Sequence, residues 1–135
     1  VKSKGYGCAT YISTHAICDS PLGENCFVGD MSIINPFVKI GYNNFFFEKV
    51  FIGNDSVIKN NCYFSPLSTI GTFSEINSNC VLGTGSIVKT SVKIAEKTLI
   101  GASCYISRDS RVNGVYAQRS SEFIADKSIK VDISI

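Results

Sequence analysis

The chain has 135 residues, of which 44% are hydrophobic, and a formal net charge of +2 at pH 7. This length fits a single domain, and no apolar run approaches the roughly 18 residues that a membrane-spanning helix needs. The 13 basic residues are interspersed with 11 acidic ones, so the charge pattern gives no sign of a nucleic-acid or anionic-lipid partner.

Residues 1–21 lack a regular period and are expected to form an irregular lead-in to the fold. Within them, Tyr11-Ile12 predicts a short strand and Asp19-Ser20-Pro21 predicts a turn. The chain begins at Val1 without an initiator methionine. The sequence therefore leaves open a preceding domain that is absent from this chain.

From residue 22 onward a large apolar side chain recurs every six residues. The positions are Leu22, Val28, Ile34, Ile40, Phe46, Ile52, Ile58, Phe64, Ile70, Ile76, Leu82, Val88, Ile94, Ile100, Ile106 and Val112. A second register four residues later, from Cys26 to Ser110, holds small or short side chains with the exception of Asn44. One large and one small inward residue per hexapeptide is typical of a parallel β-helix. We therefore predict an all-β, left-handed parallel β-helix in which residues 22–115 make about five coils.

Glycine recurs directly after the large inward residue, as at Gly53, Gly71 and Gly83. Asparagine stands at another corner, at Asn25, Asn43, Asn61 and Asn79. Because both residue types tolerate left-handed backbone angles, we expect them to form the tight corners between short strands.

The outward residues sort onto three faces at the period of one coil. Two faces are largely apolar, namely Phe27, Phe45, Tyr63, Val81, Leu99 and Ile33, Phe51, Thr69, Ile87, Tyr105. The third is largely charged, namely Lys39, Val57, Glu75, Lys93, Arg111. Exposed apolar stripes of this extent are unusual on a monomer, so we predict a homotrimer.

Beyond Val112 the repeat decays, and residues 116–135 form a C-terminal tail. Alternation of Ile129, Val131, Ile133 and Ile135 predicts a final strand there.

Four of the six cysteines, Cys26, Cys62, Cys80 and Cys104, lie on the small inward register. There a thiol behaves as a compact hydrophobic side chain. No close ligand pair of the kind zinc requires is present. Cys62 and Cys80 are one coil apart, within reach of a disulfide, but we expect free thiols and a cytoplasmic protein.

Several segments resemble the left-handed β-helix acyltransferases, in particular bacterial sugar acyltransferases of the sialic-acid O-acetyltransferase type. They are Cys8-Ala9-Thr10-Tyr11-Ile12-Ser13, Glu24-Asn25-Cys26-Phe27, residues 34–41 (INPFVKIG) and Gly114-Val115-Tyr116. The resemblance implies a homotrimer that binds acetyl-CoA between subunits and transfers the acyl group to a sugar or nucleotide sugar. Many members carry a nucleotide-sugar-binding domain just ahead of the position of Lys4-Gly5-Tyr6, near which this chain begins.

In that family a histidine that acts as general base follows the Ile-Gly step of the central coil. The matching segment here reads Ile52-Gly53-Asn54-Asp55, so Asn54 stands in place of the histidine and Asp55 fits its acidic partner. Asn cannot accept a proton near neutral pH, which leaves Asp55 and Glu48 as candidate bases. A turn carboxylate that bonds local backbone is an equally good interpretation of Asp55, and a solvated corner is the favoured one for Glu48. The single histidine, His15, is interpreted as a loop residue, and one histidine excludes a three-histidine metal site.

By family position the acetyl-CoA contacts fall on Tyr63, Thr72, Gly83, Thr84, Gly101 and Ala102. We expect no metal, because the cysteine spacing and the single histidine do not fit a metal site. An equally good interpretation is that Gly83 and Gly101 only form corners of the helix. The alternative function is a catalytically silent β-helix that serves as a trimerisation or binding module, which the loss of histidine at Asn54 favours.

Overall fold

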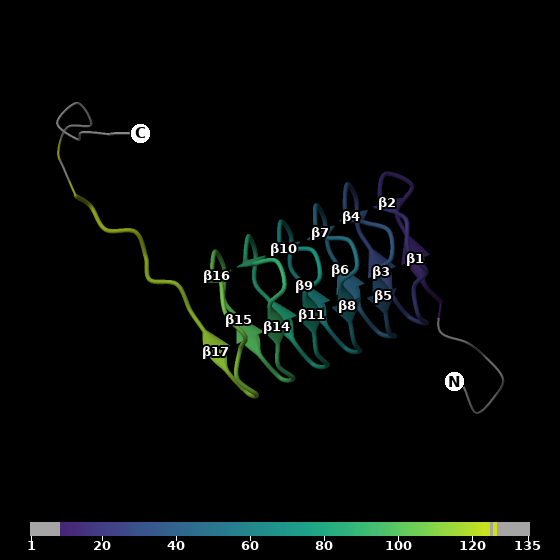
Figure 1. The fold of residues 1–135 in the computed structure, drawn as a ribbon. Helices are drawn as coiled ribbons and strands as arrows, with labels where there is room; N and C mark the ends of the chain where they lie inside the picture. The colour runs from purple at the N-terminus through teal and green to yellow at the C-terminus, as the bar shows by residue number, and fades with distance from the viewer. Residues whose placement is uncertain (1–8, 125, 127–135) are drawn as a thin grey trace.

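The computed structural model describes residues 9–124 and 126, which form a left-handed parallel β-helix without α-helices (Figure 1). Sheet A contains β1 (Tyr11–Ile12), β3 (Phe27–Val28), β6 (Phe45–Phe46), β9 (Tyr63–Phe64), β12 (Val81–Leu82), β15 (Leu99–Ile100) and β17 (Val115–Tyr116). Sheet B contains β2 (Ile17–Cys18), β4 (Ile33–Ile34), β7 (Phe51–Ile52), β10 (Thr69–Ile70), β13 (Ile87–Val88) and β16 (Tyr105–Ile106). Sheet C contains β5 (Lys39–Ile40), β8 (Val57–Ile58), β11 (Glu75–Ile76) and β14 (Lys93–Ile94).

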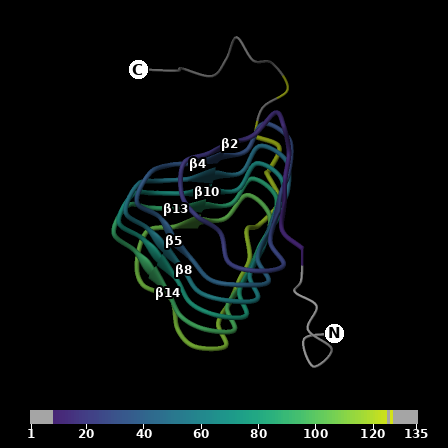
Figure 2. The same cartoon turned by 90° about the vertical axis from the view of Figure 1, so that its right-hand side faces the viewer.

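Seen along its axis, the chain winds as a triangular coil with one sheet on each side (Figure 2). Consecutive coils pair in parallel, for example Phe45 with Tyr63 and Phe46 with Phe64. Each large inward residue therefore stacks on its equivalent in the next coil. Phe46 and Phe64 are fully buried, and their rings stack with centroids 4.7 Å apart. The predicted hexapeptide β-helix is confirmed.

The ends of the helix differ from the prediction. Tyr11 pairs with Phe27 and Leu99 pairs with Val115, so the first and last coils are two residues shorter than the 18-residue coils between them. The lead-in thus contributes β1 and β2, and the helix has about six coils rather than five. Val112, predicted to point inward, is 55% exposed, because sheet C ends at β14 and the last coil, in which Tyr116 pairs with Ile100, is two residues too short for the six-residue register to continue. The predicted strand at 129–135, like Cys8 and Lys4-Gly5-Tyr6, lies outside the described residues.

The corner glycines serve a different purpose from the one predicted. Asn25, Asn43, Asn61 and Asn79 do have left-handed φ angles of 53° to 63°, but among the described glycines only Gly85 does, with φ +67°. The other glycines allow coils to approach closely. A Cβ atom at Gly71, for example, would lie 2.4 Å from the backbone nitrogen of Thr90.

The small inward residues also tie the coils together through hydrogen bonds. Ser32 Oγ donates to the carbonyl of Phe47 at 2.6 Å, and Cys80 Sγ donates to that of Ala95 at 3.1 Å. Asn44 is the one long side chain in this register, and it is buried. Its Nδ2 donates to the Lys59 carbonyl and its Oδ1 accepts from the Cys62 N–H, so both polar atoms have partners. Five cysteines are free thiols, as predicted for them. The Cys62 thiol donates a hydrogen bond to Cys80, and this bond together with burial raises the pKa of the Cys62 thiol.

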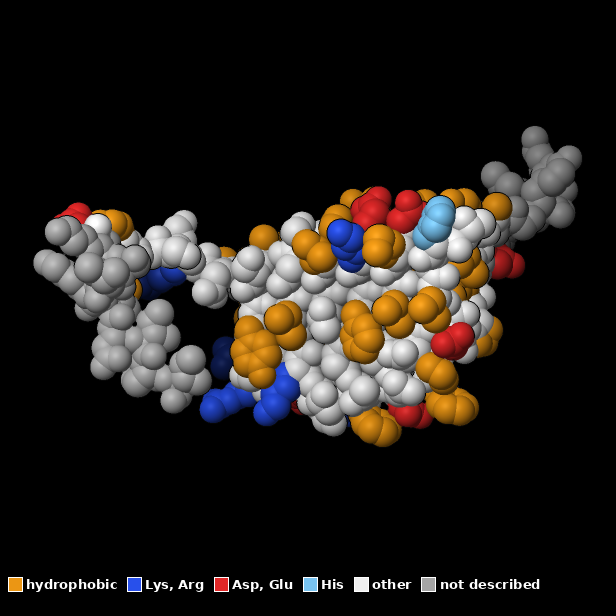
Figure 3. Space-filling model, turned by 90° about the horizontal axis from the view of Figure 1, so that it is seen from above, with side chains coloured by type: hydrophobic (Ala, Val, Ile, Leu, Met, Phe, Trp, Pro, Cys, Tyr) orange, Lys and Arg blue, Asp and Glu red, His pale blue; other side chains and the backbone are white. Residues whose placement is uncertain are grey.

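The outward faces of sheets A and B are apolar, as the sequence indicates. Val81 and Leu99 on sheet A and Ile87 and Tyr105 on sheet B are all more than one-third exposed, and hydrophobic side chains gather in rows on the surface drawn in Figure 3. Sheet C carries Lys39, Glu75 and Lys93 and ends at β14, so Arg111 is not on it. Among the described residues no helix is long and apolar enough to cross a bilayer.

Candidate functional site

Each coil turns at three corners, which we name by the sheets they join. The A–B corner comprises residues 13–16, 29–32, 47–50, 65–68, 83–86 and 101–104. The B–C corner comprises residues 35–38, 53–56, 71–74 and 89–92, and the C–A corner comprises residues 23–26, 41–44, 59–62, 77–80 and 95–98. Residues 18 apart therefore form columns along each corner, and a ligand bound at one corner meets members of the same column.

Asn54 and Asp55 lie at the B–C corner, directly after β7. Asn54 is half-buried, and its backbone carbonyl accepts the N–H of Phe73 at 3.0 Å. Asp55 is exposed and has a left-handed φ of 58°. Its carboxylate makes no hydrogen bond or ion pair with any described residue, so it is not held by local backbone and is open to a ligand.

Two phenylalanines flank Asp55 in the same column. Phe37 precedes it by one coil and Phe73 follows it by one coil; they are 75% and 65% exposed. Both have left-handed φ angles, 64° and 56°, which are uncommon for bulky residues. At the C–A corner the equivalent positions are mostly asparagine, which tolerates this conformation. The B–C corner thus presents aromatic rings to solvent on both sides of a free carboxylate.

Glu48 lies at a different corner from Asp55, since β7 separates the A–B corner from the B–C corner. The structure therefore does not bring the two candidate bases together within one chain. Glu48 instead lines an open pocket of about 270 Å³ together with Tyr11, Phe27, Gly29 and Asp30.

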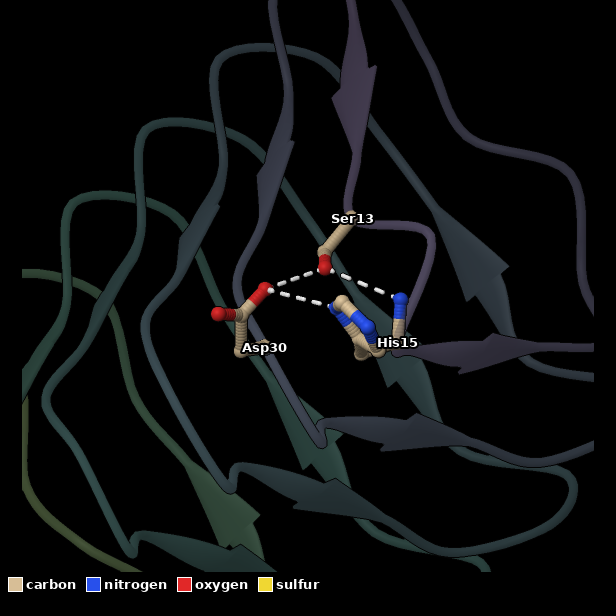
Figure 4. Close-up of polar contacts among 3 residues, drawn as sticks. All are labelled: Ser13, His15 and Asp30. Atoms are coloured by element: carbon tan, nitrogen blue, oxygen red, sulfur yellow. Dashed lines mark hydrogen bonds and ion pairs between the residues drawn. The ribbon is translucent and has the colours of Figure 1, made fainter.

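Asp30 lines this pocket and belongs to a small polar cluster with Ser13 and His15 (Figure 4). Ser13 Oγ donates a hydrogen bond to Asp30 Oδ1 and accepts one from the backbone N–H of His15 at 3.1 Å. His15 Nδ1 lies 3.9 Å from the same carboxylate oxygen. His15 is therefore a loop residue, as predicted: it lies in the turn between β1 and β2 and its side chain is 77% exposed, with Nδ1 beside Asp30.

Aromatic rings run from the pocket across successive coils, on sheet A and at the adjoining A–B corner. Tyr11 and Phe27 stack with centroids 5.3 Å apart and an interplanar angle of 19°. Phe27 also contacts Phe47 at 5.7 Å, and Phe47 contacts Tyr63 at 4.6 Å. The predicted acetyl-CoA contact at Tyr63 therefore belongs to a continuous aromatic strip that begins at the pocket.

The other predicted acetyl-CoA contacts divide between two corners. Gly83, Thr84, Gly101 and Ala102 lie at the A–B corner in successive coils, and a Cβ at Gly83 would lie 2.5 Å from the Ala102 nitrogen. Coil stacking alone thus accounts for glycine at position 83. Thr72 lies at the B–C corner, where a Cβ at Gly53 would lie 2.6 Å from its nitrogen. The described residues contain no group of three or more potential metal ligands.

Sequence reasoning missed Asp30, Ser13 and the pocket. A signal for Asp30 was available, because it stands 18 residues ahead of Glu48 and so belongs to the same column. Ser13, His15 and Tyr11 lie in the shortened first coil, whose offset hides them from an 18-residue period.

No protein-family model matches the sequence, and no curated protein matches it. Among solved structures, the chain is similar to a histidine-to-asparagine mutant of perosamine N-acetyltransferase from Caulobacter crescentus in complex with CoA and GDP-perosamine. The TM-score is 0.77 and the identity 26%, over 80% of this chain and 52% of that one. WeeI from Acinetobacter baumannii AYE gives a TM-score of 0.79 at 18% identity, over 84% of this chain and 57% of that one.

The acetyltransferase domain of PglB from Neisseria gonorrhoeae FA1090, in complex with acetyl coenzyme A, gives a TM-score of 0.58 at 17% identity, over 78% of this chain and 54% of that one. The chain therefore spans about half the length of these three proteins. The O-acetyltransferase type indicated by the sequence stays a prediction. The chain has the fold of the left-handed β-helix acetyltransferases.

Proposed function

We propose that this protein is a homotrimeric acyltransferase that moves an acetyl or other acyl group from acyl-CoA to a sugar or nucleotide sugar. The observation that carries the proposal is the likeness, at 26% identity over 80% of this chain, to an N-acetyltransferase in complex with CoA and GDP-perosamine. The free carboxylate of Asp55 beside Asn54, at an exposed corner, supplies a proton acceptor.

The chemistry requires little beyond positioning and one proton acceptor. An amine or hydroxyl of the acceptor attacks the thioester carbonyl carbon, the C–S bond breaks, and CoA leaves as a thiolate. The proton lost by the acceptor passes to Asp55 and then to the thiolate. The side-chain amide of Asn54 donates a hydrogen bond to the thioester oxygen, where negative charge develops.

The separation of the two carboxylates has a consequence for assembly. Glu48 and Asp55 lie on different corners of one chain, so both flank one ligand only when the A–B corner of one subunit faces the B–C corner of its neighbour. Tyr63, Gly83, Thr84, Gly101 and Ala102 would then line the acyl-CoA groove from one subunit, and Thr72 from the other.

The trimer is tested by a matched pair of substitutions. Val81→Asp places a charge on sheet A between Tyr63 and Leu99, whereas Val57→Asp places it on sheet C between Lys39 and Glu75. Burying an unpaired charge costs several kcal/mol. In sedimentation, the parent and Val57→Asp are expected at three times the 14.7 kDa chain mass and Val81→Asp as monomer. If the parent sediments as a monomer, the proposed acyl-CoA groove between subunits does not exist.

Acyl-donor binding is tested by calorimetric titration of the full chain with acetyl-CoA. The mutant complex of perosamine N-acetyltransferase shows that an acetyltransferase of this fold holds CoA with a histidine replaced by asparagine. We expect one acetyl-CoA bound per chain in the parent. The silent-module alternative, which Asn54 in place of histidine favours, predicts no heat of binding, and that result would support it.

A further inference from the structure

The C-terminal end of the β-helix leaves the edge of sheet B unpaired. Inside the sheet, each strand donates backbone N–H groups to the next coil, as the Ile87 N–H does to the Cys104 carbonyl at 2.8 Å. β16 is the last strand of the sheet, and the N–H groups of Tyr105 and Ser107 have no hydrogen-bond partner among the described residues. An open edge of this kind is a template for another strand.

The edge of sheet C at the same end of the helix is closed. There the backbone N–H groups of Lys93 and Ala95 donate to Asp109 Oδ1 at 2.9 Å and to Ser110 Oγ at 2.7 Å. Two side chains of the following loop thus take the place of a further coil. No side chain in the described part of the chain does the same for β16, so the edge of sheet B is available to a strand.

One segment of the chain has the sequence that this edge requires. Phe123 and Ile124 stand 18 residues after Tyr105 and Ile106, and they repeat the pattern of an outward aromatic residue and an inward isoleucine. Ser128 follows Ile124 by four residues, as the small inward residue does in the other hexapeptides. In the structure Phe123 and Ile124 are 81% and 79% exposed, and the chain runs away from the helix after β17 (Figure 1). The segment therefore has the pattern of a β-helix strand but is not paired with its own helix.

The register explains why the chain's own helix does not continue into this segment. Each A–B corner has four residues, and a corner of that length after β17 would place Ser121 and Glu122 on β16, with Glu122 pointing inward. Burying an unpaired carboxylate is costly. Because the last coil is two residues short, Phe123 and Ile124 are two residues out of register in their own chain. The segment of a second copy does not pass through that corner, so it is free of this constraint.

We propose that Phe123–Ile124 of a second copy pairs with β16 as an added strand of sheet B, so that each copy gives this arm to another. The backbone carbonyls of the arm accept the N–H groups of Tyr105 and Ser107. Ile124 packs on Ile106 at the end of the core, and Phe123 lies beside Tyr105 as a cross-strand neighbour. The outward row of sheet B is thereby extended, which makes the exchange continuous with a face that we expect to lie between subunits. Exchange of an identical element is a low-cost route to association.

Cross-linking tests the pairing directly. Neighbouring strands lie about 4.8 Å apart, a distance that a disulfide can bridge. After oxidation with diamide, Tyr105→Cys/Phe123→Cys is expected to run as covalent oligomers in non-reducing electrophoresis, with the two bridged peptides identified by mass spectrometry. The matched control is Lys93→Cys/Phe123→Cys, in which the first cysteine lies on the closed edge of sheet C at the same end; it should remain a single chain. A disulfide confined to single chains, or equal cross-linking of the control, would overturn the exchange.

A second measurement leaves the aromatic pair intact. Ile124→Asp places a charge at the inward position of the arm, and Ser120→Asp places the same charge at an exposed position just before it. Hydrogen exchange of the Tyr105 and Ser107 amides, followed by NMR, should be at least about tenfold slower in the parent and in Ser120→Asp than in Ile124→Asp, which loses the buried isoleucine. Rapid exchange of both amides in the parent would show that β16 is unpaired and would refute the proposal. Neither measurement uses acyl-CoA, so failure of the arm exchange is distinct from failure of the proposed function.

Discussion

Gly71→Ala is expected to lower the free energy of unfolding by about 1–3 kcal/mol or more, one of the two largest effects that we predict. The added Cβ would lie 2.4 Å from the Thr90 nitrogen and 2.8 Å from its Cα. Both neighbours are backbone atoms of the next coil, so neither can rotate away, and the coils must separate. The measurement is urea unfolding followed by circular dichroism.

Gly85→Asn is the matched control. Gly85 has a left-handed φ of +67°, and its Cβ would meet nothing closer than Ser103 Oγ at 3.8 Å. Asparagine occupies the same backbone conformation at Asn61 and Asn79, so the substitution should change the free energy of unfolding by less than about 0.5 kcal/mol. If the two substitutions lowered stability equally, close approach would not be the reason for glycine at position 71.

Asp55→Asn is expected to lower turnover by about 10²-fold or more, as for a lost general base, with acetyl-CoA affinity nearly unchanged. Its carboxylate has no partner in the described chain, so the substitution removes a proton acceptor without removing a structural contact. Release of the CoA thiol, followed with a thiol reagent in the presence of amino sugars, measures turnover. Asn54→His is expected to raise turnover, because imidazole titrates near neutral pH.

Asp19→Asn provides the control for Asp55→Asn. Asp19 is also exposed and follows β2 in sheet B, as Asp55 follows β7 in the same sheet. The same loss of charge two coils away should leave turnover unchanged. If turnover is unchanged by Asp55→Asn, then Asp55 is not the proton acceptor and Glu48 becomes the candidate.

The sequence predicts the middle of the fold well, because inward positions of a β-helix repeat without interruption. Ile52, Ile70 and Val88 follow the six-residue period and are buried as that period requires. It fails at Val112, where the last coil is two residues shorter and the side chain is 55% exposed. The length of a coil depends on how it pairs with the preceding coil, and a fixed sequence period carries no information about that pairing.

The candidate site is only partly predictable for a related reason. Residues 18 apart share a column, so the period relates Asp30 to Glu48 and shows that Asp55 is on another corner. The 18-residue period does not relate Asp30 or Glu48 to Tyr11 or Ser13, because the first coil has a different length. The close approach of coils at Gly29 and Gly71 is likewise a property of three-dimensional stacking, whereas composition alone suggests only flexible corners.

Acyl transfer by the parent protein tests the central claim most directly. The full chain is incubated with acetyl-CoA and glucosamine, and the sugar is examined by mass spectrometry while released CoA thiol is quantified. We predict an acetylated sugar formed in equal amount to the free thiol. Absence of any acetylated sugar together with absence of acetyl-CoA binding would contradict the acyltransferase and leave a silent β-helix module.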